Sequence, residues 1–361
     1  MKKIARAAAG LASAVLATIG IVCVGVRVPG GAIQKAAGAA AGFIMPSENI
    51  ESLFHDEAEE DDGSASSHRP SSPVSASVVP APGKAPPKNA QSAASPTSPS
   101  VSVPPSNSSA KILELSIGNS GTQVGNFWVK NSTEHHTSLN FTQELQKVPP
   151  VKIKRSNASP QVLIYHTHTT ESYDCTARTT DKSKSVCAVG DAITEQLQAM
   201  GIAVAHDTTY HDYPAYDGSY DRSKVTMQKN MKKYPGIQVT LDIHRDAMHR
   251  DDGTCLKTTT VVNGKKAAQM MILAGCDDDG SLAFPNWECN LRLALRLQKA
   301  LCTSYPGLAR PMDFCARKYN EDMTKGSLLI EIGTDANTLE EAVYSGELLG
   351  KSLAQVLNGL T

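Results

Sequence analysis

The sequence is short of the features that mark a nucleic-acid-binding protein. Aromatic residues make up only 5% of its 361 residues, and 35 Lys and Arg residues are balanced by 36 Asp and Glu residues, which leaves a net charge of −1. Proteins that bind nucleic acids normally carry a basic patch for the phosphates and aromatic rings on which bases stack. The composition therefore argues against a nucleic-acid partner.

Nucleotide-binding and kinase motifs are also missing. Gly118, Gly121 and Gly125 punctuate a loop, but no GK[ST] follows them, and the only GKS, which starts at Gly350, lies in a segment with helical periodicity. An HRD sequence begins at His244, yet the Gly-rich loop, the strand lysine and the DFG sequence of kinases are absent. We therefore expect neither a phosphate-binding loop nor a kinase.

The eight cysteines lack the spacing of a thiolate zinc knuckle, because no two of them form a CxxC pair. Cys23 lies in an apolar N-terminal run, which leaves seven cysteines in the rest of the chain. Seven is an odd number, so at least one thiol stays unpaired within a monomer, even in a compartment that allows disulfides. The pairing does not follow from the sequence.

The N-terminus has the pattern of a membrane anchor over residues 1–30. Lys2, Lys3 and Arg6 precede an uncharged run over 7–26, which as a helix just spans a hydrocarbon core of about 30 Å. The basic residues on its N-terminal side predict a single-pass protein of the cell membrane whose remaining chain is extracytoplasmic. The alternative is a cleaved signal peptide, but the run is longer than the usual apolar region of one.

Residues 31–110 are predicted to be a disordered tether. Six carboxylates crowd into positions 56–62, and residues 64–110 hold ten prolines and fifteen serines. Like charges repel, and such a composition buries too little apolar surface to offset its ordering entropy. The following residues, 111–158, are predicted to be a small β-rich segment, because KILELSIG and NFWVKN read as short strands.

Residues 159–361 alternate between strand and helix patterns. This alternation predicts an α/β fold with a mostly parallel sheet flanked by helices. The strands are expected at 162–165, 202–206, 237–244, 269–275 and 327–333, and the helices at 190–200, 223–234, 287–301 and 339–357.

Three of the predicted strands end in polar sequences: YHTHTTE at 165–171, DIHRD at 242–246 and EIG at 331–333. If these strands are parallel neighbours, the three sequences meet at one edge of the sheet. Two histidines and a carboxylate suit a catalytic zinc, which takes three protein ligands and leaves a fourth position for water. A second carboxylate could then act as the general base.

Each of the three polar sequences, taken alone, has a simpler interpretation. A single His at a strand end is often only hydrogen-bonded, and Glu331 could be an ion-pair partner of Arg245. The occurrence of all three sequences at strand ends favours the zinc site.

Several long motifs, in the same order, resemble the stage II sporulation protein P family. They are QVLIYHTHTTESY, HDYPAYDGSYDRS, LDIHRDA, PNWECNLRLALRLQ and KGSLLIEIGTDANTLEEA, and the resemblance runs from about residue 159 to residue 357. It implies a fold like that of the N-acetylmuramoyl-L-alanine amidases, with one Zn²⁺. It also implies amidase and endopeptidase action on peptidoglycan during forespore engulfment, together with the stage II sporulation proteins D and M.

The resemblance also assigns metal ligands. His168 follows the first strand after a short turn, as the first zinc histidine does in the amidases, and His244 matches the second. Glu171 completes an HxxE spacing with His168 and is the expected third ligand. His166 is the rival of His168, and the sequence does not choose between them.

Glu331 matches the catalytic glutamate of the amidases. Arg245 and Asp246 are expected to contact substrate or to support the ligands, whereas a structural role is at least as fitting for Asp242. Thr334 departs from the family pattern, in which we expect Asn at that position.

The expected reaction is zinc-assisted hydrolysis of the amide bond between N-acetylmuramic acid and L-alanine, with Glu331 moving the proton. Two other functions stay open at this point. One is a zinc carboxypeptidase on stem peptides, in which Arg245 binds the terminal carboxylate. The other is a non-catalytic, wall-binding scaffold.

Overall fold

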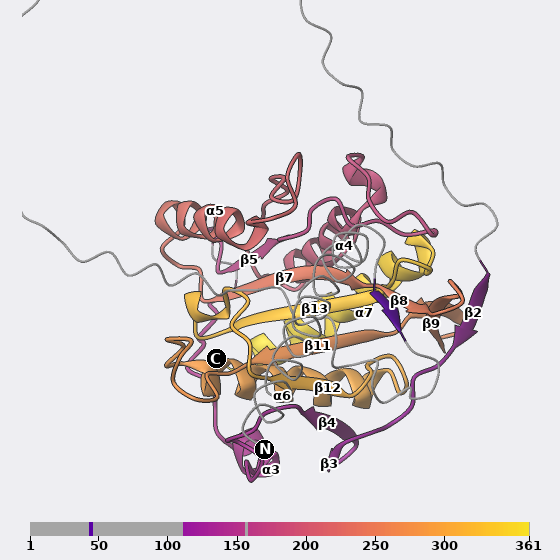
Figure 1. Cartoon of the computed structure of the whole chain (residues 1–361). Helices are drawn as coiled ribbons and strands as arrows, with labels where there is room; N and C mark the ends of the chain where they lie inside the picture. Colours follow the sequence, from indigo (N-terminus) through magenta and orange to yellow (C-terminus); the bar gives the residue numbers. More distant parts are fainter. Residues whose placement is uncertain (1–42, 46–110, 156–157, 361) are drawn as a thin grey trace, which may run out of the picture. The chain divides into compact units, whose positions relative to one another are not determined.

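Residues 43–45, 111–155 and 158–360 are the part of the chain that the computed structural model describes (Figure 1). The membrane anchor expected at 1–30 lies outside these residues. So does the tether expected at 31–110, apart from strand β1 (Phe43–Met45). Within the described residues, no helix is both long and apolar enough to cross a membrane.

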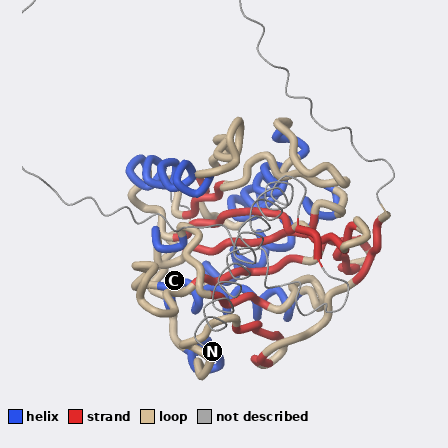
Figure 2. The backbone as a smooth tube through the Cα atoms, in the orientation of Figure 1, coloured by secondary structure: helices blue, strands red, loops and turns tan. Residues whose placement is uncertain are grey.

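An eight-stranded sheet carries the fold, and Figure 2 shows its strands side by side. Five neighbouring pairs are parallel, but β11 runs antiparallel to β13, and β3 runs antiparallel to β4. The sheet is therefore mixed, which corrects the expectation of a mostly parallel one. In sheet order its strands are β3 (Thr122–Val124), β4 (Phe127–Asn131), β12 (Met312–Cys315), β11 (Met270–Gly275), β13 (Ser327–Thr334), β7 (Val239–Asp246), β5 (Val162–Tyr165) and β6 (Val204–His206).

The reversal of β11 has a cause in the chain that precedes it. A parallel neighbour requires a long crossover, usually a helix. Between β7 and β11 the chain instead forms short strands of a second sheet, so it re-enters the main sheet from the edge at which it left. This second sheet contains β1, β8 (Met248–Arg250), β9 (Cys255–Val262) and β10 (Lys265–Ala268), and β2 (Ile112–Leu115) pairs with β9.

Helices cover both faces of the main sheet. Side chains alternate between the faces of a strand, and on β5 Val162 and Ile164 join the large core cluster, whereas Leu163 and Tyr165 pack with Met227 of α5. The face covered by α5 (Ser219–Lys233) is called the α5 face below. The opposite face packs against α4 (Val186–Ala199), α6 (Trp287–Ser304) and α7 (Leu339–Asn358). The remaining helices of the described residues are α3 (Phe141–Gln146), η2 (Lys182–Lys184) and η3 (Glu321–Met323).

Local sequence explains where the long helices begin. Ser185 caps α4 by accepting a hydrogen bond from the backbone N–H of Cys187 at 3.2 Å. Thr338 and Glu341 form a capping box at the start of α7. Both caps fix the starts of helices that pack against β5, β7 and β13.

Candidate metal and catalytic site

The polar ends of β5, β7 and β13 meet at one edge of the main sheet. β7 is parallel to both neighbours, with Tyr165 beside Asp242 and Glu331 beside His244. Ile243 and Ile330 point into the large core. Asp242, His244 and Glu331, at the alternate positions, therefore lie on the α5 face. The parallel arrangement of these three strands agrees with the sequence expectation.

Two histidine rings face each other at this edge. The ring centroids of His168 and His244 are 5.3 Å apart, and the rings are nearly perpendicular, at 81°. Tyr216 lies flat on His168, with ring centroids 4.5 Å apart, and its hydroxyl is 3.1 Å from His168 Nε2. Because the hydroxyl of Tyr216 lies within hydrogen-bond distance of Nε2, Nδ1 is the ring nitrogen of His168 that suits a metal.

Carboxylates hold the ring of His244 from two sides. Asp242 Oδ1 lies 3.0 Å from His244 Nε2, and Glu171 Oε2 lies 3.4 Å from His244 Nδ1. Asp242 is itself fixed, because it accepts hydrogen bonds from the backbone N–H and the hydroxyl of Thr167 at 2.7 and 2.5 Å. A carboxylate on the far nitrogen of a ligating histidine is the usual device for orienting the ring.

Charge at the site is set by burial and by these pairs. Burial raises the pKa of Glu171, but the charge and hydrogen bond of His244 and the charge of Arg245 outweigh this effect and lower the pKa to about 2. Burial lowers the pKa of His244, but Asp242 and Glu171 outweigh it, and the pKa is raised well above its usual value. The surroundings therefore favour positive charge at the position between the carboxylates.

Glu331 has the opposite property. Burial raises its pKa to about 8, and the negative charges of Asp246 and Glu171 add to this, against the effect of His244. Among the described residues, its Oε2 is buried without a hydrogen-bond partner. A carboxyl group with a pKa near neutrality can both take up and return a proton.

His166 is turned away from this group. Its Nδ1 lies 2.8 Å from the carbonyl oxygen of Ile243, and its Nε2 lies 2.9 Å from Nε2 of His206. Burial and the neighbouring His206 lower its pKa to about 3. Both ring nitrogens are engaged in the interior, so the structure brings His168, and not His166, to His244.

The side chain of Arg245 anchors the loop that carries Glu171. Its Nε donates to the carbonyl oxygen of Ser172 at 3.0 Å and its Nη2 to that of Ala177 at 2.6 Å. Its backbone N–H donates to Glu171 Oε2 at 3.1 Å. Asp246, by contrast, pairs with the fully buried Arg310 at 2.7 Å. Both side chains are thus bonded to other parts of the protein, Arg245 to backbone carbonyl oxygens and Asp246 to Arg310.

Two aromatic residues of the site were missed by the sequence reading. Tyr216 stacks on His168, and Tyr220 approaches the same ring edge-on, with centroids 5.7 Å apart. The signal was the tyrosine-rich stretch HDYPAYDGSY, which precedes and opens α5. Thr334 has a structural contact with the backbone of β9, because its hydroxyl donates to the carbonyl oxygen of Leu256 at 2.7 Å.

Comparison with known proteins decides the family. The sequence profile of the family described as stage II sporulation protein P matches residues 88–354. The chain belongs to this family. Stage II sporulation protein P of Bacillus subtilis (strain 168) is 31% identical over 232 residues, which cover 58% of this chain and 54% of that protein. The chain thus spans about half the length of this relative.

Solved structures with weak similarity include two amidases. N-acetylmuramoyl-L-alanine amidase AmiC2 of Nostoc punctiforme is 11% identical, with a TM-score of 0.33, over 55% of this chain and 94% of that one. The CwlD amidase from Clostridioides difficile, solved in complex with the GerS lipoprotein, is 14% identical, with a TM-score of 0.34, over 55% and 98%.

Proposed function

We propose that this member of the stage II sporulation protein P family is a zinc-dependent peptidoglycan hydrolase. The bond that we assign to it is the amide between N-acetylmuramic acid and L-alanine. The observation that carries the proposal is the meeting of His168, Glu171 and His244 beside Glu331, a buried carboxyl group whose pKa is raised to about 8. Family membership supplies the substrate class.

The residues fit a zinc ion by their chemistry. Two imidazoles and one carboxylate are a common donor set of catalytic zinc sites. Asp242 lies against the ring of His244, and the buried Oε2 of Glu331 has no hydrogen-bond partner among the described residues. When bound, zinc supplies a Lewis acid that polarises the scissile carbonyl and makes water more acidic.

The chain's own groups have distinct tasks in this reaction. Glu331 takes a proton from the attacking water and returns it to the leaving amine nitrogen. Arg245 positions the loop of Glu171 through the carbonyl oxygens of Ser172 and Ala177. Tyr216 fixes the plane of the His168 ring.

The rival functions find less support. In a carboxypeptidase Arg245 would bind the terminal carboxylate of a stem peptide, but its guanidinium already donates to two backbone carbonyl oxygens. A wall-binding scaffold has no use for two imidazoles and a carboxylate that meet beside the buried carboxyl group of Glu331. Cleavage of peptide cross-links, by contrast, uses the same chemistry and is retained as a second activity.

The cellular setting is part of the proposal. Family membership supports a role in sporulation, and we place the catalytic residues 159–361 outside the cytoplasm, behind an anchor at 1–30 and a tether at 31–110. The stage II sporulation proteins D and M are the partners that we expect in forespore engulfment.

Digestion of purified peptidoglycan by the purified full-length chain tests the activity. We expect intact stem peptides with a free N-terminal L-alanine, separated by mass from lactyl-bearing glycan. A chelator should abolish their release, and added Zn²⁺ should restore it. Release of D-alanine alone would indicate a carboxypeptidase, and unchanged peptidoglycan with zinc-loaded protein would reject the proposal.

A further inference from the structure

A group of side chains of the types that bind metals lies at the opposite edge of the main sheet from Glu331. β11 is antiparallel to β13, with Met271 beside Glu331 and Leu273 beside Leu329. The end of β11 therefore lies near the beginning of β13, far along the strands from Glu331. Cys276 follows directly, so it belongs to the edge that the catalytic residues do not occupy.

Three different ligand types converge there. One ligand atom each from His136, Cys276 and Asp278 lies within 4.8 Å of the other two, and His136 Nε2 is 3.8 Å from Asp278 Oδ1. Ligands bound tetrahedrally to one zinc ion lie roughly 3.3–3.7 Å apart, given the usual metal–ligand bond lengths. The three side chains thus need to close by about 1.5 Å at most to share an ion.

The surrounding structure holds these side chains in place. Asp278 accepts hydrogen bonds from the backbone N–H groups of Glu134 and His135 at 2.8 and 3.1 Å, and the ring of Trp287 lies 4.8 Å from that of His136. The backbone N–H of Cys276 donates to the carbonyl oxygen of Cys315 at 2.9 Å. A pre-positioned donor set loses little entropy when it binds an ion.

The thiol of Cys276 is free to act as a ligand. Its side chain is fully buried at the border of the large core cluster, and it forms no disulfide. The competing interaction is weak, because His136 Nε2 lies 3.3 Å from the carbonyl oxygen of Asp277, longer than the usual hydrogen bond of about 2.9 Å. A metal would replace this contact with a stronger bond and give the sulfur a ligand role.

We propose that His136, Cys276 and Asp278 bind a zinc ion with a structural role. The imidazole, thiolate and carboxylate are all ligands that zinc accepts. The ion would tie the loop between β4 and α3 to the end of β11. It shares no residue with the ligands proposed above.

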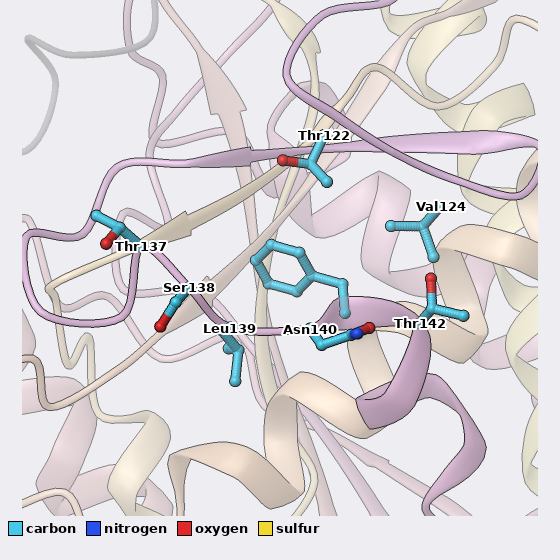
Figure 3. Close-up of a pocket in the computed structure, with 8 residues that line it drawn as sticks. Thr122, Val124, Thr137, Ser138, Leu139, Asn140 and Thr142 are labelled. Atoms are coloured by element: carbon cyan, nitrogen blue, oxygen red, sulfur yellow. The ribbon is translucent and has the colours of Figure 1, made fainter.

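The loop between β4 and α3, which contains His136, also borders a cavity. Residues Thr137, Ser138 and Leu139, directly after His136, line a cavity of about 320 Å³ together with Thr122 and Val124 of β3. Figure 3 shows this loop across from the β3 residues. A metal at His136 would therefore fix one wall of the cavity.

Cobalt substitution of the full-length chain tests the site by a signal that activity does not influence. The metal-free chain, loaded with Co²⁺, should show the near-ultraviolet charge-transfer absorption of a thiolate–cobalt bond. Cys276→Ser should abolish this band and lower the zinc content by one ion per chain. His136→Ala, whose side chain is partly exposed, should lower the zinc content by the same amount and serves if the serine variant does not fold.

Two matched variants separate this site from others. Cys302→Ser removes a thiol on α6 that lies outside the group, and it should keep both the band and the zinc. His244→Ala should lose one zinc ion but keep the thiolate band, which makes the two sites independent. The absence of a thiolate band in the cobalt-loaded chain, or its persistence in Cys276→Ser, would overturn the assignment.

Discussion

Glu331 and His244 are direct neighbours on two parallel strands, β13 and β7. The two side chains share the α5 face, and both are buried. Their proton affinities are set in different ways. Desolvation dominates at Glu331 and raises its pKa to about 8, whereas Asp242 and Glu171 overcome desolvation at His244. Glu331 is thus suited to carry a proton, whereas the carboxylates around His244 favour a positive charge there.

Glu331→Gln tests the first of these roles. Gln keeps the shape of the side chain but cannot accept a proton, so we expect turnover to fall by roughly 10²–10⁴-fold. Zinc content and the thermal midpoint should stay near those of the wild type. Loss of zinc would instead make Glu331 a ligand, and near-normal turnover by folded, zinc-loaded protein would reject its role as general base.

Glu321→Gln is the matched control for this change. Glu321 is also buried, but its oxygens accept backbone N–H groups from Gly275 at 2.9 Å and Leu329 at 3.2 Å, away from the catalytic edge. The new amide group would face an N–H donor, so the thermal midpoint should fall. The folded fraction should retain its turnover.

Asp242→Asn tests whether this carboxylate orients His244. Its oxygen lies 3.0 Å from His244 Nε2, and loss of such a supporting carboxylate typically lowers metal affinity by about 10–100-fold. Competition with a chromophoric chelator measures the change. Asp191→Asn is the control, because Asp191 is bonded at 2.9 Å to His206, which contacts His166 and not the proposed ligands. A larger loss of affinity in the control would favour His166 as the ligand.

Gly350→Ala tests a packing role for the glycine of the GKS sequence. A Cβ at this position of α7 would meet Gln196 Cβ at 2.8 Å and the carbonyl oxygen of Ile193 at 2.9 Å, both on α4. Backbone atoms of a packed helix cannot move aside cheaply, so we expect a loss of about 1–3 kcal/mol in the free energy of unfolding.

Gly118→Ala is the control for this substitution, since its Cβ would meet nothing within 4 Å. Chemical denaturation should show little change for it. Because Ala is a better helix former than Gly by up to about 1 kcal/mol, a stabilised Gly350→Ala variant would show that α4 and α7 can separate without cost.

The sequence predicts the elements that carry the site because their signals are local. The apolar run before His166 and the alternation before His244 indicate β5 and β7, and periodicity indicates α4, α6 and α7. The hairpin of β9 and β10 was missed, although it had a signal. Asn263 and Gly264, with φ of 51° and 78°, are the Asn-Gly pair typical of a tight hairpin turn.

Other features depend on contacts between distant residues. Periodicity carries no strand direction, so the antiparallel course of β11 could not be read from its apolar run. The choice between His166 and His168 depends on His206 and Tyr216, which lie 40 and 48 residues away from them in the chain. The group of His136, Cys276 and Asp278 likewise joins two segments that no motif connects.

Asp313→Asn tests how much the burial of a carboxyl group that is a ligand in neither proposed site lowers stability. Asp313 lies on β12, and burial raises the pKa of its carboxyl from 3.8 to about 6, against the weaker effect of Lys130. Below pH 4 the carboxyl group is protonated in the folded and the unfolded chain, and it does not affect stability. As the pH rises toward 6, the unfolded chain releases this proton while the folded chain keeps it, so stability falls. Above pH 6 the loss is complete.

The stability of Asp313→Asn should therefore differ from that of the wild type only at pH values at which the buried carboxyl group destabilises the wild type. Two pKa units correspond to about 3 kcal/mol at most, so Asp313→Asn should unfold at a temperature several degrees higher at pH 7.5. Near pH 3.5 the two proteins should melt together, because Asn resembles the protonated carboxyl group and can still accept the hydrogen bond from Ser132 Oγ. Melting curves at both pH values make the comparison. An equal shift at both would show that the substitution changes packing and not the ionisation of Asp313.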